Sequence, residues 1–127
     1  KNPAGANEVL RTLTLEAGEL DLWLALNDGI ADGRDVSWIW DADFEVLAGR
    51  VRRATCSGTR AEEMGLRLKY AGIEEQAIAV DRDLGASLDA ALRGAGSERV
   101  YALPTYTALL DLRDMLTRRG LAKRWSE

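Results

Sequence analysis

Residues 20–26 read LDLWLAL, and residues 27–35 continue as NDGIADGRD. A segment that is apolar at nearly every position is typical of a strand covered on both faces, as in the middle of a parallel sheet. The next nine residues carry two glycines, which can take positive φ, and show no apolar periodicity. The pair of segments therefore predicts a buried strand that ends in a polar loop.

The rest of the chain alternates predicted helices with short apolar segments. Asn2-Pro3 is typical of a helix start, with asparagine as the cap and proline in the first turn. Thr59 and Glu62 have the spacing of a capping box, and Thr105 stands where the last helix needs its N-cap. Helices are predicted over residues 4–15, 37–47, 59–70, 84–92 and 105–119, and strands over residues 51–56, 77–80 and 99–103.

The segment after the polar loop is ambiguous. Residues 36–40 (VSWIW) have strand composition, yet Trp40, Phe44 and Leu47 recur at helical spacing, so a helix is the prediction. Trp38 and Trp40 cannot both point straight inward from one helix. Either one of them is partly exposed and contacts a partner, or both pack in the core.

Four strands that alternate with helices favour the α/β class: a Rossmann-like, mainly parallel sheet with helices on both faces. The chain has 127 residues and a mass of 13.9 kDa, which fits a single domain over residues 1–127. In such sheets ligands collect beyond the carboxyl ends of the strands. The candidate loops are therefore residues 27–35, 57–60 and 104–105.

The composition excludes several classes of function. Histidine is absent, so this chain alone carries no Ser-His or Cys-His mechanism, and the single Cys56 excludes a cysteine-cluster metal site. No metal site is predicted. No stretch approaches the roughly 18–20 apolar residues that span a bilayer, and no signal peptide is recognisable, so we expect no membrane insertion. The lone cysteine favours a reducing, cytoplasmic compartment.

Negative charge is concentrated in residues 27–45, which hold six acidic residues and one arginine in a chain of net charge −4. Such a surface argues against nucleic acid as a partner. Asp28, Asp32 and Asp35 could bind Mg²⁺, orient an imidazole or simply be solvated. Because the chain has no histidine, such an imidazole would have to belong to another chain.

The turn at residues 57–60 (SGTR) is a second candidate site. Free amides at a helix N-terminus, together with the Arg60 guanidinium, suit an anionic group, although a capped helix with a surface arginine is the simpler interpretation. Neither a Walker A loop nor a GxGxxG motif is present, so the sequence shows no complete nucleotide site.

Four segments together resemble a known family: KNPAGANEVL at 1–10, NDGIADGRDVSWIWDADFE at 27–45, SGTRAEEMGLRLKYAG at 57–72 and LPTYTALLDLR at 103–113. They are similar to the C-terminal domain of MurT, the Mur-ligase-like subunit of lipid II isoglutaminyl synthase. The likeness covers residues 1 to about 120. A weaker similarity to Mur ligases in general rests on Asn2-Pro3 and Arg34-Asp35.

The resemblance implies a part of a larger enzyme. MurT pairs with GatD, a glutaminase that releases ammonia with a cysteine and a histidine, and it uses ATP and Mg²⁺ to activate the D-glutamate α-carboxylate of lipid II for amidation. The family implies that a MurT aspartate completes the GatD cysteine–histidine pair. The residue carried over is Asp35, with Asp41 and Asp32 as alternatives. Arg34, Thr59 and Arg60 are candidate contacts to ATP or substrate.

The sequence also departs from whole MurT. The P-loop, the Mg²⁺-holding carboxylates and the zinc ribbon of the central domain are missing, so we expect a fragment of a longer chain that binds no cofactor and is inactive by itself. The expected partners are GatD, the rest of MurT, and lipid II as substrate of the complex. A non-catalytic α/β scaffold or a receiver-like signalling module are the alternatives. The latter needs a lysine after its last strand, and none occurs between Lys69 and Lys123.

Overall fold

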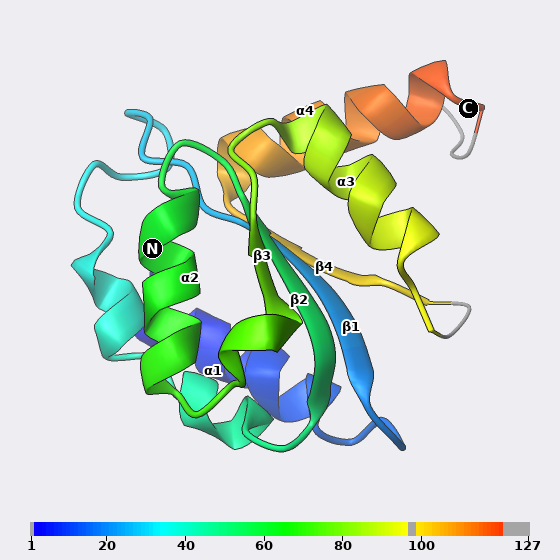
Figure 1. Ribbon diagram of the computed structural model, residues 1–127. Coiled ribbons are helices and arrows are strands. Elements are labelled where there is room, and N and C mark those ends of the chain that lie inside the picture. The colour runs from blue at the N-terminus through cyan, green and yellow to red at the C-terminus, as the bar shows by residue number, and fades with distance from the viewer. Residues whose placement is uncertain (1, 97–98, 121–127) are drawn as a thin grey trace.

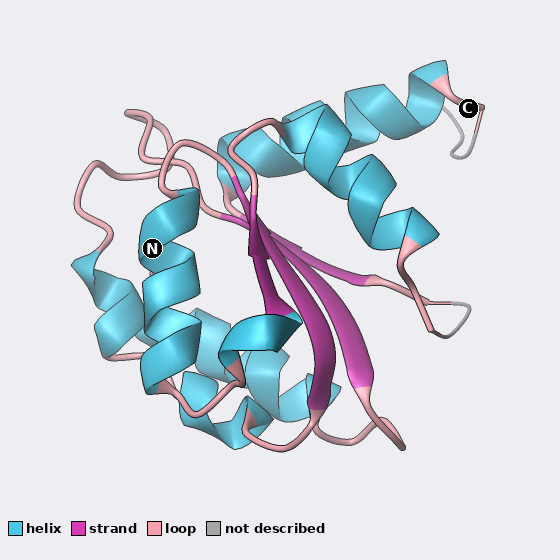
Figure 2. Ribbon diagram, viewed as in Figure 1, coloured by secondary structure: helices cyan, strands magenta, loops and turns pink. Residues whose placement is uncertain are grey.

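The protein contains a four-stranded parallel sheet between two layers of helices, as the computed structural model shows over residues 2–96 and 99–120 (Figures 1 and 2). The strand order is β3-β2-β1-β4, and every neighbouring pair is parallel. The strands are β1 (Leu20–Ala25), β2 (Val51–Ser57), β3 (Ile78–Val80) and β4 (Tyr101–Pro104), and the helices are α1 (Pro3–Leu13), α2 (Ala61–Tyr70), α3 (Leu84–Arg93) and α4 (Tyr106–Arg118). The predicted α/β, Rossmann-like class is confirmed.

Strand β1 is buried along its whole length and separates two cores. Leu22 and Leu24 belong to the core under α1 and α2, whereas Trp23 and Ala25 belong to the core under α3 and α4. This alternation follows from the two-residue period of a strand. It explains why the sequence of β1 is almost continuously apolar. Trp23 is fully buried, and its indole N–H donates to Ser87 Oγ at 2.8 Å.

The predicted helix over residues 37–47 is wrong. The chain instead forms two short 3₁₀ turns, η1 (Ser37–Trp40) and η2 (Phe44–Leu47). In an α-helix the Ile39 carbonyl would accept from the amide of residue 43. Here Arg67 Nε donates to Ile39 O at 2.7 Å, and the Asp43 amide donates to Asn7 Oδ1 at 2.7 Å. Tertiary partners therefore replace the helical hydrogen bond.

Arg67 is a buried arginine that holds this segment on α2. Its side chain is 3% exposed, and Nη2 donates to Ala42 O and to Glu45 Oε1, both at 2.8 Å. The guanidinium also lies 5.2 Å from the centre of the Trp40 ring and 5.4 Å from that of Phe44. One side chain thus satisfies two carbonyls and organises the aromatic residues around it.

Two of the predicted N-caps behave differently from expectation. Asn2 is confirmed, because its Oδ1 accepts from the Ala4 amide at 2.8 Å. The capping box of Thr59 and Glu62 is wrong: α2 has Arg60 at its N-cap without a side-chain cap bond. Thr105 does occupy the N-cap of α4, but its hydroxyl makes no cap bond there. Among the described helices, none is long and apolar enough to cross a membrane.

We expect Arg67→Met to lower the free energy of unfolding by about 2–4 kcal/mol. The change leaves the Ile39 carbonyl without its donor and leaves the Ala42 carbonyl with the Phe44 amide alone. Arg82→Met is the matched control. Arg82 forms an exposed ion pair with Glu62 at 2.9 Å, so its loss costs less than about 1 kcal/mol. Urea unfolding followed by tryptophan fluorescence measures both; equal midpoints for the two variants would contradict this account.

Candidate functional site

The carboxyl ends of β1, β2 and β4 bring the predicted candidate loops together. Asn27, the second residue after the end of β1, connects them. Its amide donates to Thr105 Oγ1 at 3.0 Å, and its side-chain Nδ2 donates to Thr107 Oγ1 at 2.8 Å, both at the start of α4. Its Oδ1 accepts from the Thr59 amide at 3.0 Å, in the turn after β2. One asparagine therefore ties the three strand ends to one another.

The turn after β2 requires a glycine at this contact. Gly58 has φ +92°, and a Cβ built on it would lie 2.5 Å from the Leu26 carbonyl oxygen and 2.6 Å from Asn27 Oδ1. A side chain at this position would therefore both strain the backbone and displace the strand end. The close approach of the two turns depends on Gly58.

Asp28 links the acidic loop to the Thr59–Arg60 turn. Thr59 Oγ1 donates to Asp28 Oδ1 at 2.9 Å, and Arg60 Nη1 donates to Asp28 Oδ2 at 3.0 Å. Arg60 also forms an ion pair with Glu63. The Thr59 hydroxyl, and then Arg60, hold the pKa of the Asp28 carboxyl below its ordinary value. The structure thus brings the predicted residues Thr59 and Arg60 together around an acid of the same chain.

The same turn offers little to a phosphate in this conformation. The Gly58 amide donates to Arg82 O, the Thr59 amide to Asn27 Oδ1, the Arg60 amide to Leu26 O, and the Ala61 amide to Gly58 O. A nucleotide phosphate does not fit here unless these groups and Asp28 first release their partners. Arg34 is exposed, and among the described residues no hydrogen bond or ion pair joins its side chain to this turn. The contact of Arg34, Thr59 and Arg60 with ATP stays a prediction.

Asp32 is buried and held at the start of α4. It is 3% exposed; Oδ1 accepts from the Thr107 amide at 2.7 Å and Oδ2 from the Thr107 hydroxyl at 2.6 Å. A carboxylate at a helix N-terminus satisfies a free amide and interacts favourably with the helix dipole. Both oxygens of Asp32 are therefore engaged within the fold.

Asp35 has the opposite environment. Its side chain is exposed, and Oδ1 accepts from the Ser37 amide at 2.9 Å. This hydrogen bond is the main reason that the pKa of Asp35 lies below its ordinary value. The carboxylate is therefore ionised at neutral pH, held by the backbone and open to the outside. Asp41 is also exposed, but no side-chain hydrogen bond holds it within residues 2–96 and 99–120.

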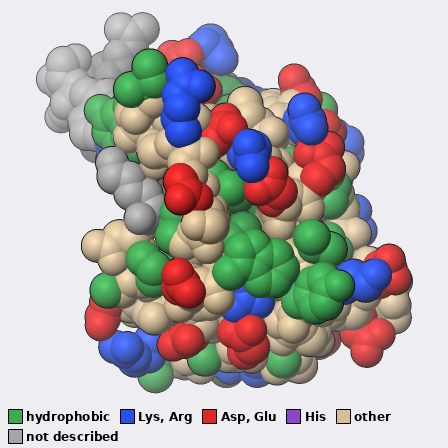
Figure 3. All heavy atoms as spheres, turned by 90° about the vertical axis from the view of Figure 1, so that its left-hand side faces the viewer, with side chains coloured by type: hydrophobic (Ala, Val, Ile, Leu, Met, Phe, Trp, Pro, Cys, Tyr) green, Lys and Arg blue, Asp and Glu red, His purple; other side chains and the backbone are tan. Residues whose placement is uncertain are grey.

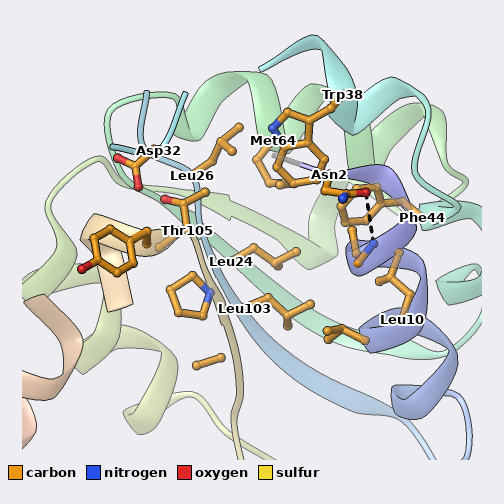
Figure 4. Close-up of a pocket in the computed structure, with 17 residues that line it drawn as sticks. Asn2, Leu10, Leu24, Leu26, Asp32, Trp38, Phe44, Met64, Leu103 and Thr105 are labelled. Carbon is orange, nitrogen blue, oxygen red and sulfur yellow. Dashed lines mark hydrogen bonds between the residues drawn. The ribbon is translucent and has the colours of Figure 1, made fainter. Parts of the chain in front are cut away.

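An apolar pocket of about 450 Å³ lies beside these loops (Figure 4). Leu24 and Leu103 form its floor on the sheet, Trp38 and Phe44 lie toward one side, and Asp32 is on the other. Trp38 is half-buried in this pocket, whereas Trp40 is 46% exposed and packs edge-to-face on Tyr70 with ring centres 5.8 Å apart. Of the two tryptophans, Trp40 is thus the more exposed.

Metal and thiol chemistry find no support in the described residues. Over residues 2–96 and 99–120, no three His, Cys, Asp or Glu side chains come together in a way that could hold a metal ion. Cys56 is buried at the end of β2, and burial raises the pKa of its thiol to about 12. Such a thiol is not a nucleophile at neutral pH. The exposed polar groups of these loops include the Asp35 carboxylate, the Arg34 guanidinium and the Thr59 hydroxyl.

Sequence reasoning missed the residues that position this site. Asn27 was part of a predicted loop, and Thr107 and Arg67 were assigned only to helices. The one available signal was position. Asn27 directly follows the strand predicted over residues 20–26, and Thr107 lies in the first turn of the helix predicted over residues 105–119. Asn27 bonds to Thr107, 80 residues away in the chain, and Arg67 bonds to Glu45, 22 residues away. Local sequence patterns do not reveal such bonds.

The fold and the polar strand ends place this chain among Rossmann-like α/β domains with a carboxylate-bearing loop after the central strand. A family model, MurT ligase C-terminal, matches residues 1–109. The chain therefore belongs to the MurT ligase C-terminal family.

Curated relatives agree with this assignment. The chain is 42% identical over 119 residues to the lipid II isoglutaminyl synthase (glutamine-hydrolyzing) subunit MurT of Staphylococcus aureus, strains COL and N315, which covers 93% of this chain and 26% of the relative. It is 33% identical over 125 residues to the subunit of the same name from Streptococcus pneumoniae (strain ATCC BAA-255 / R6), covering 98% of this chain and 28% of the relative. The chain thus spans about a quarter of the length of these relatives.

Asp28→Asn should make stability less dependent on pH in acid. Because the folded pKa of Asp28 is lowered, its contribution is present above the ordinary aspartate pKa and is lost as the pH falls below about 4 toward the folded value. Urea midpoints at pH 6 and pH 3 should therefore differ less for Asp28→Asn than for the wild type. Asp41→Asn, whose side chain has no hydrogen-bond partner among the described residues, is the control. If the difference between the two midpoints is the same in Asp28→Asn as in the wild type, Asp28 is not a source of the pH dependence.

Proposed function

We propose that this chain is the C-terminal domain of the MurT subunit of a lipid II isoglutaminyl synthase, and that it docks a GatD-type glutaminase and lends that subunit a carboxylate. In the complex, Asp35 completes a cysteine–histidine pair that belongs to the partner. The ammonia released from glutamine then serves the ATP-dependent amidation of the D-glutamate α-carboxylate of lipid II. The domain also helps to close the ATP site, and it is inactive by itself.

The observation that carries the proposal is the environment of Asp35. Among the three candidate aspartates, it alone combines an exposed carboxylate with a side chain held by a hydrogen bond, from the Ser37 amide at 2.9 Å. Asp32 is buried with both oxygens on Thr107, and Asp41 is exposed without such a bond in the described part of the chain. A carboxylate that serves a partner must be both accessible and oriented, and Asp35 meets both requirements.

In this proposal the imidazole comes from the partner, because residues 1–127 contain no histidine. A carboxylate that accepts a hydrogen bond from an imidazole N–H fixes the tautomer and stabilises the imidazolium formed when the ring takes a proton. The imidazole then removes the proton from the partner's cysteine and makes it a better nucleophile. The Asp35 carboxylate, whose pKa lies below the ordinary aspartate value, is ionised at neutral pH as this task requires. Asp35 contributes orientation and charge, whereas the bond-making groups are the partner's.

ATP and Mg²⁺ belong to the whole complex in this proposal. The described residues form no metal cluster, and the Thr59–Arg60 turn is occupied by Asp28. The proposal therefore gives this domain a role in enclosing the ATP-dependent site, and it assigns nucleotide binding mainly to the central domain of MurT.

Asp35→Asn in the full-length subunit, purified with its glutaminase partner, should lower kcat for glutamine hydrolysis by about 10²–10⁴-fold. The amide cannot accept the imidazole proton with the same strength and does not stabilise the imidazolium. Gel filtration should show an intact complex, because the side chain retains its size. Glutamate release measures the rate.

Asp41→Asn is the matched control, as it removes a carboxylate from the same exposed segment. We expect its hydrolysis rate to stay within about twofold of the wild type, as is usual for an exposed group outside the reacting centre. Loss of hydrolysis in Asp41→Asn with a normal rate in Asp35→Asn would transfer the role to Asp41. Normal rates in both variants would withdraw the carboxylate role from Asp35 and Asp41 and leave the domain the roles of docking the glutaminase and closing the ATP site.

A further inference from the structure

Asp35 lies between two fixed points of the acidic loop. Gly33, Arg34 and Asp35 are the three residues between Asp32 and Val36. Asp32 is buried against α4, and Val36 is 5% exposed in the core under α1 and α2. The position of Asp35 therefore depends on both anchors, of which the one at Asp32 is polar.

The polar anchor consists of three side chains, Asn27, Asp32 and Thr107, joined through the Thr107 hydroxyl, and we name it the Thr107 latch. The Thr107 hydroxyl donates to Asp32 Oδ2 at 2.6 Å and accepts from Asn27 Nδ2 at 2.8 Å. The Thr107 amide adds a bond to Asp32 Oδ1 at 2.7 Å. The Thr107 hydroxyl thus donates to Asp32 at one end of the segment 27–32 and accepts from Asn27 at the other end.

We propose that Thr107 is a positioning residue for glutamine hydrolysis: through Asp32 it holds the loop that presents Asp35 to the partner's imidazole. The inference rests on the proposed function of Asp35. Helix α4 comes late in the sequence and covers the face of the sheet opposite to α1 and α2. The inference makes the first turn of α4 part of the glutaminase site.

The physical reason is the cost of leaving Asp32 partly unsatisfied. A buried carboxylate that loses a hydrogen-bond donor is driven toward water, and the three residues that follow it move with it. Displacement of an orienting group by about 1 Å is enough to cost on the order of 100-fold in rate. Loss of one of the two bonds should cost less, because the Thr107 amide still holds Asp32.

The test uses the full-length subunit in complex with its glutaminase. Thr107→Val removes the hydroxyl bonds and keeps both the shape and the amide. We expect kcat for glutamine hydrolysis to fall about tenfold with KM within about twofold, whereas Thr107→Ser, which restores the hydroxyl, should stay within about threefold of the wild type. Thr117→Val makes the same change at the other end of α4, where the hydroxyl has no hydrogen bond within residues 2–96 and 99–120, and should have no effect.

A double-mutant cycle separates positioning from loss of stability. If Thr107 acts through Asp35, Thr107→Val should cause no further loss of kcat in an Asp35→Asn background. A further tenfold loss there, or a normal kcat for Thr107→Val when Asp35→Asn is impaired, would overturn this inference and leave the proposed function intact. A normal rate for Asp35→Asn itself would overturn both the inference and the proposed function.

If Thr107→Val does not form the complex on gel filtration, Asp32→Asn tests the Thr107 latch instead. The expected fall in kcat and the double-mutant cycle are then the same.

Discussion

The central constraint of this structure is that β1 is buried on both faces and paired along both edges. The strand can meet water only where it ends. Its last backbone groups continue to bond beyond the sheet: the Leu26 amide donates to Ser57 O at 2.9 Å, and the Asn27 amide donates to Thr105 Oγ1 at 3.0 Å. These bonds hold the turns after β2 and β4 in place beside the end of β1, where buried backbone groups need hydrogen-bond partners.

This constraint also explains how the fold uses its acidic loop. The six acids of residues 27–45 look like one block of charge in the sequence, but they have separate environments. Asp28 neutralises Arg60, Asp32 caps α4, and Glu45 pairs with the buried Arg67. These three carboxylates bond to groups of their own chain. Asp35, Asp41 and Asp43 are exposed, and the Ser37 amide holds the Asp35 carboxylate. Part of the negative charge of this segment is thus compensated by Arg60 and Arg67 within the fold.

The sequence predicted what depends on local pattern. The apolar run of β1, the Asn2 cap and the alternation of helices and strands are properties of neighbouring residues, and the structure has them. It failed where a distant side chain competes with the local hydrogen bond. The apolar spacing of Trp40, Phe44 and Leu47 is helical, yet Arg67 takes the Ile39 and Ala42 carbonyls. Thr59 has the spacing of a capping box, yet its hydroxyl bonds to Asp28, 31 residues away.

The candidate site shows the same division between pattern and tertiary contact. Residues 1–127 contain no histidine, so any imidazole at this site comes from outside them, and the position after β1 was enough to select the loop as a candidate. Local pattern does not show that Asp32 bonds within its own fold, because its partner Thr107 lies 75 residues away in the chain. Burial separates Asp32 from Asp35: Asp32 is 3% exposed and fully engaged by Thr107, while Asp35 is exposed and held by one amide. Only three positions in the chain thus separate a carboxylate that is buried and engaged within the fold from one that is exposed and held by a backbone amide.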